Sequence, residues 1–147
     1  MGQMLCNNFS PPKCTFITWL TILDRLATCD RLQKFGIVCD QLCVLCGNVD
    51  ETRDHLFFVC EFSYEIWSSL LCWLGIQRTA GDWQGVLQSA HCQSNSSASC
   101  IFRMCISIAV YFIWRERNAR KFQQVKMKPD EIVRNDQNCY LLKVFSS

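Results

Sequence analysis

The spacing of three cysteines and one histidine between residues 43 and 60 constrains the fold of this chain most. The order C-x2-C-x8-H-x4-C is formed by Cys43, Cys46, His55 and Cys60. Thiolates two residues apart in a C-x2-C turn can bind one ion, and structural zinc sites use four tetrahedral nitrogen and sulfur ligands. Gly47 directly after the second cysteine gives the turn access to positive φ. The pattern predicts a structural zinc site and not a catalytic one, because four protein ligands leave no position for water.

The high cysteine content leaves an alternative open. The chain has 12 cysteines in 147 residues, so a C-x2-C pair can arise by chance and the four residues could simply be buried. Cys39 is a competing ligand, although the Cys43–Cys46 pair is the better chelate. The N-terminus lacks the features of a secretory signal, which favours reduced thiols in an intracellular location, nuclear or cytoplasmic. We therefore expect no disulfide among Cys14, Cys29, Cys72, Cys100, Cys105 and Cys139.

The apolar residues before the motif and directly after it recur at helical spacing. A first helix is predicted over about 13–26. A second is predicted from the N-cap Thr28 to Gly36, with Leu32 and Phe35 buried. A third is predicted to begin near Asp50 or Thr52. The first is marked by Phe16, Trp19, Leu20 and Leu23. Phe62, Ile66, Leu70 and Trp73 mark a fourth helix that ends at Gly75.

The second half of the sequence predicts one long helix. Ile101, Met104, Cys105, Ile108 and Phe112 trace its apolar face, and it reaches about Phe122. A weak helix is expected near Asp82, a loop over 91–99 and a last helix from Pro129. The apolar run 104–114 is too short to span a membrane. The fold class is mostly α: a zinc-binding domain (11–75) with a turn or hairpin between helices, a linker with a weak helix (76–99), and a helical C-terminal extension (100–147).

Charge is distributed unevenly along the chain. Residues 1–75 carry net charge −3 and residues 76–147 carry +5. A basic tract follows the long helix and is interleaved with Trp114 and Phe122, as is typical of proteins that bind single strands. Its members, Arg115, Arg117, Arg120, Lys121, Lys126 and Lys128, are candidate contacts to RNA or DNA phosphates. The alternative is a solvated helix end in which basic groups complement the helix dipole.

Several segments together resemble the zinc-binding domain of plant non-LTR reverse transcriptases. The resemblance rests on residues 26–32 (LATCDRL), 36–37 (GI), 43–47 (CVLCG), 51–60 (ETRDHLFFVC) and 66–67 (IW), and more loosely on WRERNARKF at 114–122. It implies that Cys43, Cys46, His55 and Cys60 are the zinc ligands. It also implies a LINE-type retrotransposon origin and a position C-terminal to a polymerase domain, a possible partner. The sequence departs from the family at Cys29, where a basic residue is usual.

These observations lead to a functional hypothesis. The aspartates are dispersed, with no Y-x-D-D pair and no recognisable RNase H carboxylates, so polymerase or nuclease chemistry is not expected. We expect a non-catalytic, zinc-stabilised domain of retroelement origin that assists nucleic acid binding. The alternative is a structural or protein-interaction module in which zinc joins helices and no nucleic acid is bound.

Overall fold

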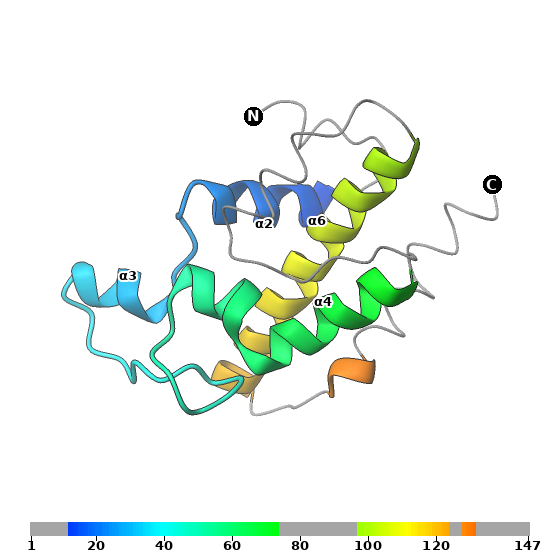
Figure 1. Cartoon of the computed structure of the whole chain (residues 1–147). Coiled ribbons are helices and arrows are strands. Elements are labelled where there is room, and N and C mark those ends of the chain that lie inside the picture. The colour runs from blue at the N-terminus through cyan, green and yellow to red at the C-terminus, as the bar shows by residue number, and fades with distance from the viewer. Residues whose placement is uncertain (1–11, 74–96, 124–127, 132–147) are drawn as a thin grey trace.

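Helices make up most of the described structure, a computed structural model that describes residues 12–73, 97–123 and 128–131. Their order is α2 (Pro12–Ile22), α3 (Cys29–Lys34), η1 (His55–Val59), α4 (Glu61–Trp73), α6 (Ser97–Asn118) and η2 (Ala119–Gln123), where η marks a π-helical turn (Figure 1). Within these ranges no strand occurs, and one antiparallel bridge joins Leu42 to Asp50. The predicted class, mostly α with a hairpin between helices and a long later helix, is confirmed.

The long helix α6 is the element on which the others pack. Helices α2 and α4 and the turn η1 all contact it (Figure 1). Every residue from 103 to 110 is buried, since the helix has neighbours on more than one side. The predicted apolar face is buried from Met104 to Phe112, whereas the Ile101 side chain lies outside the described part. Helix α6 begins at Ser97, so the last residues of the predicted 91–99 loop are helical.

Helix α2 buries a different face from the one predicted. It ends at Ile22, four residues before the predicted end, and Phe16 and Trp19 are 55% and 38% exposed. The buried residues are Cys14, Thr18 and Thr21. The Thr18 hydroxyl donates to the Cys14 carbonyl at 2.8 Å, which satisfies it without water. These small residues face α6, so the large aromatic residues of α2 are left on the surface.

Helix α3 agrees with the prediction at its ends but not in its packing. Thr28 is the N-cap residue, and Gly36 has φ +77°, the left-handed conformation expected after a helix. Thr28 does not cap with its side chain, because its hydroxyl donates to the Asp30 carboxylate at 2.6 Å. Phe35 was predicted to be buried and is 66% exposed. Figure 1 shows the reason: α3 lies at the edge of the described helices, and Phe35 follows its last residue.

Helix α4 follows the motif with its predicted apolar stripe. Phe62, Ile66 and Leu70 are buried, and the Trp67 indole donates from Nε1 to the Phe57 carbonyl at 2.9 Å. Trp73 is 40% exposed, so its predicted burial is wrong. The predicted stop at Gly75 lies outside the described residues, as does the weak helix near Asp82.

One hydrophobic core unites the two halves of the described chain. It contains side chains of α2, the hairpin, η1 and α4 together with those of α6. The described part of the predicted C-terminal extension therefore packs directly on the predicted zinc-binding domain, while the division at 75 and 99 stays a prediction. Residues 129–131 are helical, where a last helix was expected to begin at Pro129. Among the described helices, none is both long and apolar enough to cross a bilayer.

A buried ion pair fixes α6 against the segment before η1. Arg117 Nη2 lies 2.7 Å from Glu51 Oε1 and Nε lies 3.0 Å from Oε2, a two-point contact between side chains 2% and 0% exposed. Glu51 Oε1 also accepts the Cys29 backbone N–H at 2.9 Å and so caps the start of α3. Burial raises the pKa of the Glu51 carboxyl, whereas the hydrogen bond from Arg117 and its positive charge lower it. The second effect is larger, so the pKa lies below its ordinary value. Glu51 was expected in the first turn of the third helix and instead joins three segments.

We expect Arg117→Met to lower the free energy of unfolding by about 3–5 kcal/mol, because it leaves the Glu51 carboxylate buried without a counter-charge. The double variant Glu51→Met/Arg117→Met should recover most of this stability, since a buried ion pair can be replaced by apolar groups at little cost. Urea unfolding of the four members of this cycle measures the coupling, with the exposed Arg115→Met as control. Equal destabilisation by Arg115→Met and Arg117→Met would contradict the assignment.

Candidate metal centre

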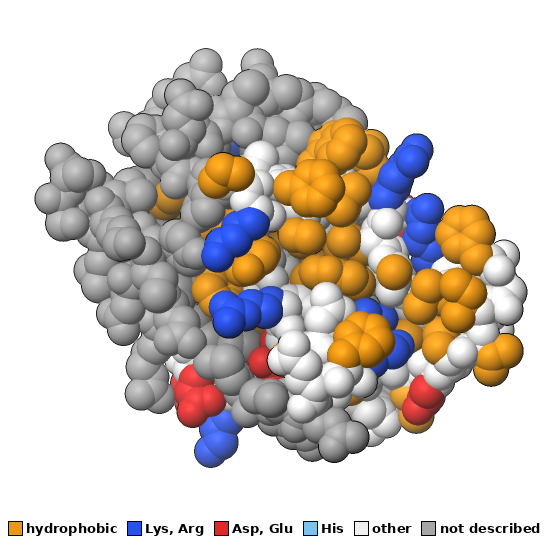
Figure 2. Space-filling model, turned by 180° about the vertical axis from the view of Figure 1, so that it is seen from behind, with side chains coloured by type: hydrophobic (Ala, Val, Ile, Leu, Met, Phe, Trp, Pro, Cys, Tyr) orange, Lys and Arg blue, Asp and Glu red, His pale blue; other side chains and the backbone are white. Residues whose placement is uncertain are grey.

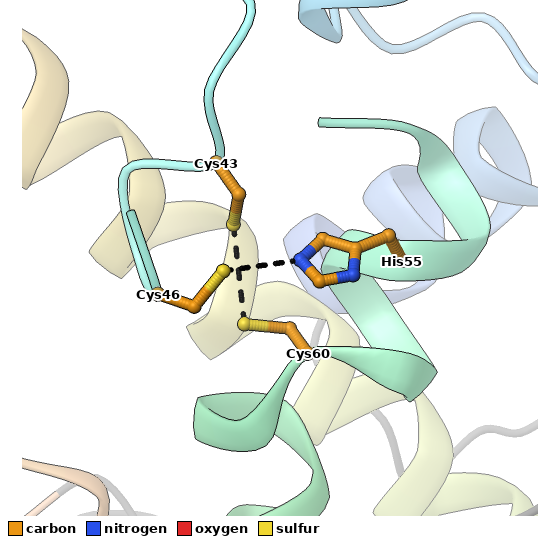
Figure 3. Close-up of side chains that lie close together, drawn as sticks. All are labelled: Cys43, Cys46, His55 and Cys60. Atoms are coloured by element: carbon orange, nitrogen blue, oxygen red, sulfur yellow. Dashed lines mark hydrogen bonds between the residues drawn. The ribbon is translucent and has the colours of Figure 1, made fainter. Parts of the chain in front are cut away.

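A hairpin positions the first two cysteines. Its strands are joined by the hydrogen bonds from the Cys43 N–H to the Val49 carbonyl at 2.8 Å and from the Glu51 N–H to the Gln41 carbonyl at 2.7 Å. The Gly47 N–H donates to the Cys43 carbonyl at 2.7 Å, and Gly47 has φ +70°. This conformation favours glycine and folds the chain back, so the side chains of Cys43 and Cys46 point to the same side (Figure 3).

A π-helical turn positions the other two residues. The Thr52 hydroxyl accepts the His55 backbone N–H at 3.1 Å, which caps the start of the turn. The turn closes with a hydrogen bond from the Cys60 N–H to the His55 carbonyl at 2.7 Å, five residues back. In a regular α-helix, residues five apart lie about 140° around the axis. The wider turn brings them onto one side, and the extended ψ of 135° at Cys60 separates it from α4.

The four side chains converge on one point (Figure 3). Cys43 Sγ lies 3.9 Å from Cys60 Sγ, and Cys46 Sγ lies 3.4 Å from His55 Nε2. All four ligand atoms lie within 4.8 Å of one another, slightly wider than the roughly 4 Å expected from zinc–ligand bond lengths. Three sulfurs and one nitrogen at these separations fit a tetrahedral ion, and the donor set is that of a structural zinc site. The site therefore binds zinc.

The thiols of this site differ in their affinity for protons. A hydrogen bond from Cys60 lowers the pKa of Cys43 to about 5, and the same contact raises the pKa of Cys60 well above its ordinary value. Cys43 and Cys60 are buried with no exposed surface, which excludes bulk water from both sulfurs. The contact thus favours a thiolate at Cys43 and a proton on Cys60, and zinc binding must displace that proton.

The other described cysteines are free thiols outside this cluster. Cys39, the competing ligand, is not part of the group, and its sulfur lies 3.9 Å from the Cys29 carbonyl. Cys14, Cys29, Cys72 and Cys105 form no disulfide, as predicted, while the Cys100 side chain and Cys139 lie outside the described part. Cys72 is exposed, so its assignment to an apolar helix face is wrong.

The basic tract is divided between the interior and the surface. Arg117 is buried against Glu51, and Lys121 Nζ lies 2.7 Å from Cys29 Sγ. Arg120 is 12% exposed and pairs with Glu116 at 2.7 Å. Arg115 and Lys128 are exposed, and Lys126 lies outside the described residues. The six bases therefore do not share one exposed face, because Arg117 and Arg120 form contacts inside the fold.

Sequence reasoning missed two residues that lie around the metal centre. Arg53 lies two residues before the ligand His55, but it pairs with Asp54 at 3.1 Å and extends toward the carbonyl groups at the end of α2. Arg120 instead reaches the hairpin, where Nη1 donates to the Leu45 carbonyl at 3.2 Å. Glu51, which binds Arg117, is the second residue that sequence reasoning missed. Both contact partners more than 60 residues away, and no local pattern signals such pairs.

The fold and the donor set define a small helical domain built around a Cys3His zinc site. Comparison with protein families identifies it further: residues 2–67 match the family described as zinc-binding in reverse transcriptase. The matched part of the chain is similar to that zinc-binding domain, and it includes all four candidate ligands. No curated protein and no solved structure matches the chain. The match covers an accessory domain and neither a polymerase nor an RNase H domain.

The ligand assignment predicts one zinc ion per chain. Replacing Cys43 or Cys60 with Ser should leave less than one zinc per chain after dialysis and lower the midpoint of thermal unfolding, because zinc binding contributes directly to folding free energy. Elemental analysis and circular dichroism measure the two effects. Cys39→Ser is the matched control, and it should retain one zinc with an unchanged midpoint. Zinc loss in Cys39→Ser and not in Cys60→Ser would contradict the assignment.

Zinc affinity should fall as the pH falls. At neutral pH, zinc binding must release at least the proton of Cys60, whose pKa is raised. Below a pH of about 5 Cys43 also becomes protonated, so the dependence becomes steeper. Calorimetry in buffers of different ionisation enthalpy counts the protons released. Binding without proton release at pH 7 would show that Cys60 is not a ligand.

Proposed function

We propose that this protein is a non-catalytic, zinc-stabilised domain derived from a plant non-LTR, LINE-type reverse transcriptase, and that it assists nucleic acid binding. The family match supports the origin from a reverse transcriptase. The segments at 26–67 and the WRERNARKF sequence at 114–122 support the narrower origin. A reverse transcriptase polymerase domain is then the natural covalent or non-covalent partner.

One observation carries the nucleic acid assignment: the exposed ring of Phe35 and the partly buried ring of Tyr111 each lie beside a cationic group. The Arg31 guanidinium lies 5.2 Å from the centre of the exposed Phe35 ring, and Lys13 Nζ lies 5.2 Å from that of Tyr111. Figure 2 shows Lys and Arg side chains between hydrophobic ones on one face, with acidic groups toward its lower edge. Such surfaces bind single strands by base stacking and phosphate contact.

Because part of the basic tract is buried, the proposed interface uses other, exposed basic residues. Arg117 contacts Glu51, so its charge is satisfied within the protein. The exposed bases of the described surface are better candidates for phosphate contacts, and they include Lys34 on α3 and Arg115 on α6. Phe16 and Trp19 of α2, whose ring centres lie 6.3 Å apart, offer a further stacking surface.

A second candidate function is a structural or protein-interaction module without nucleic acid binding. The internal use of Arg117 and Arg120 favours it, because these bases stabilise the fold without a ligand. The two candidates differ in one measurable property. Phosphate contacts release counterions, so nucleic acid binding weakens steeply with salt, whereas a purely structural module shows no such binding.

We expect the zinc-loaded protein to bind labelled single-stranded RNA or DNA with a negative slope of log K against log salt. The variant Lys34→Gln/Arg115→Gln should flatten this slope by about 0.7 for each phosphate that the variant no longer binds. Fluorescence anisotropy across a salt series measures it. The control Glu61→Gln/Glu65→Gln changes two exposed acidic residues and should leave the slope unchanged. Absence of salt-dependent binding to single-stranded and double-stranded probes would reject the proposal in favour of the structural module.

A further inference from the structure

Arg120 contacts both chain segments that supply the zinc ligands. Its Nη1 donates to the carbonyl of Leu45 at 3.2 Å, and Leu45 lies between the ligands Cys43 and Cys46. Its guanidinium carbon lies 4.6 Å from the centre of the Phe62 ring, two residues after the ligand Cys60. One side chain of η2 therefore joins the hairpin to the first turn of α4.

The orientation of Arg120 is itself fixed. Nε donates to Glu116 Oε1 at 2.7 Å, one turn back along the chain, and Glu116 is 4% exposed. The guanidinium is planar and presents its donors in fixed directions, so a bond from Nε determines where Nη1 points. The Phe62 ring is also buried, which leaves Arg120 few alternative positions. The direction of the contact to the hairpin is thus set by the packing of α4 and α6.

We infer that Arg120 is a positioning residue for the zinc site. It holds the turn between Cys43 and Cys46 against the segment that follows Cys60, through its hydrogen bond to the Leu45 carbonyl and its contact with the Phe62 ring. Groups that orient metal ligands in this way change metal affinity by about 10–100-fold when they are removed. The inference does not depend on nucleic acid binding.

A consequence follows for the extent of the metal-binding unit. The family match ends at residue 67, whereas Arg120 lies on η2, 53 positions beyond it. Glu51 and Arg117 join the same two regions through their buried ion pair. Full zinc affinity therefore needs the helix that follows the matched segment, although that helix supplies no ligand among the four.

Three variants of the full chain separate the contributions. Arg120→Met removes the hydrogen bond and the charge, and we expect its zinc dissociation constant, measured by competition with a chelator, to rise about 10–100-fold. Arg120→Lys keeps the charge and one donor and should recover most of the affinity. Arg120→Gln keeps a donor without charge and should fall between them. Arg115→Met, which removes an exposed charge from α6, is the matched control and should bind zinc as the parent protein does.

Spectra of the Co²⁺-loaded protein separate positioning from general destabilisation. The visible bands report the tetrahedral geometry of the ligands, so Arg120→Met should alter them in protein that is saturated with Co²⁺ and retains the parent's helical circular dichroism. If Arg120→Met fails to fold, the comparison of Arg120→Lys with Arg120→Gln decides. Unchanged affinity and spectra in the variants, or an equal drop in affinity in Arg115→Met, would overturn the inference.

Discussion

The buried contact between Glu51 and Arg117 is the interaction on which the arrangement of the described segments depends. A carboxylate and a guanidinium, each almost without exposed surface, lose their hydration on folding, and only close two-point contact offsets that cost. Glu51 follows the hairpin directly, accepts the first N–H of α3 and binds α6, so three segments are fixed by one side chain. Two segments joined only by apolar contacts can pack in several relative positions, whereas these directional hydrogen bonds form in only one of them. The pair therefore contributes more to specificity than to net stability.

The contact between Glu51 and Arg117 also accounts for part of the uneven charge distribution along the chain. The negative first half and the positive second half suggested a surface for an external polyanion. Part of that difference is instead used internally, since Arg117 pairs with Glu51 of the negative half and Arg120 donates to the carbonyl of Leu45. What remains for a partner is the exposed set on α2, α3 and α6, where single bases stand beside aromatic rings. A charge count along the sequence cannot distinguish the two uses, because it contains no information on burial.

The sequence predicted the metal centre and the class of fold because both depend on local patterns. The ligand spacing, Gly47 and the apolar period of α4 and α6 are each visible within about twenty residues, and the structure follows them. The failures have one cause. Phe35 was expected in the interior, and Phe16 and Trp19 on the apolar stripe of the first helix, because they are large and apolar, but burial depends on which residues pack opposite. Thr18 of α2 lies against α6, where its small side chain permits close approach, and Phe35 stays exposed among the described residues.

The departure from the family pattern at Cys29 also has a physical explanation in tertiary contacts. The resemblance to the family implies a base at this position, and here the position holds a buried thiol whose pKa is raised by burial. Lys121 Nζ lies 2.7 Å from its sulfur and Arg117 Nη2 lies 3.7 Å from it, so positive charge is present at the start of α3 although the local sequence lacks it. The bases come from α6 and η2, in the other half of the sequence. Glu51 contacts one of these bases, Arg117, whose charge and hydrogen bonds allow its carboxylate to stay ionised in the interior. Helix α6 and η2 therefore do more than pack against the zinc-binding domain, because they supply the positive charges beside Glu51 and Cys29 of that domain.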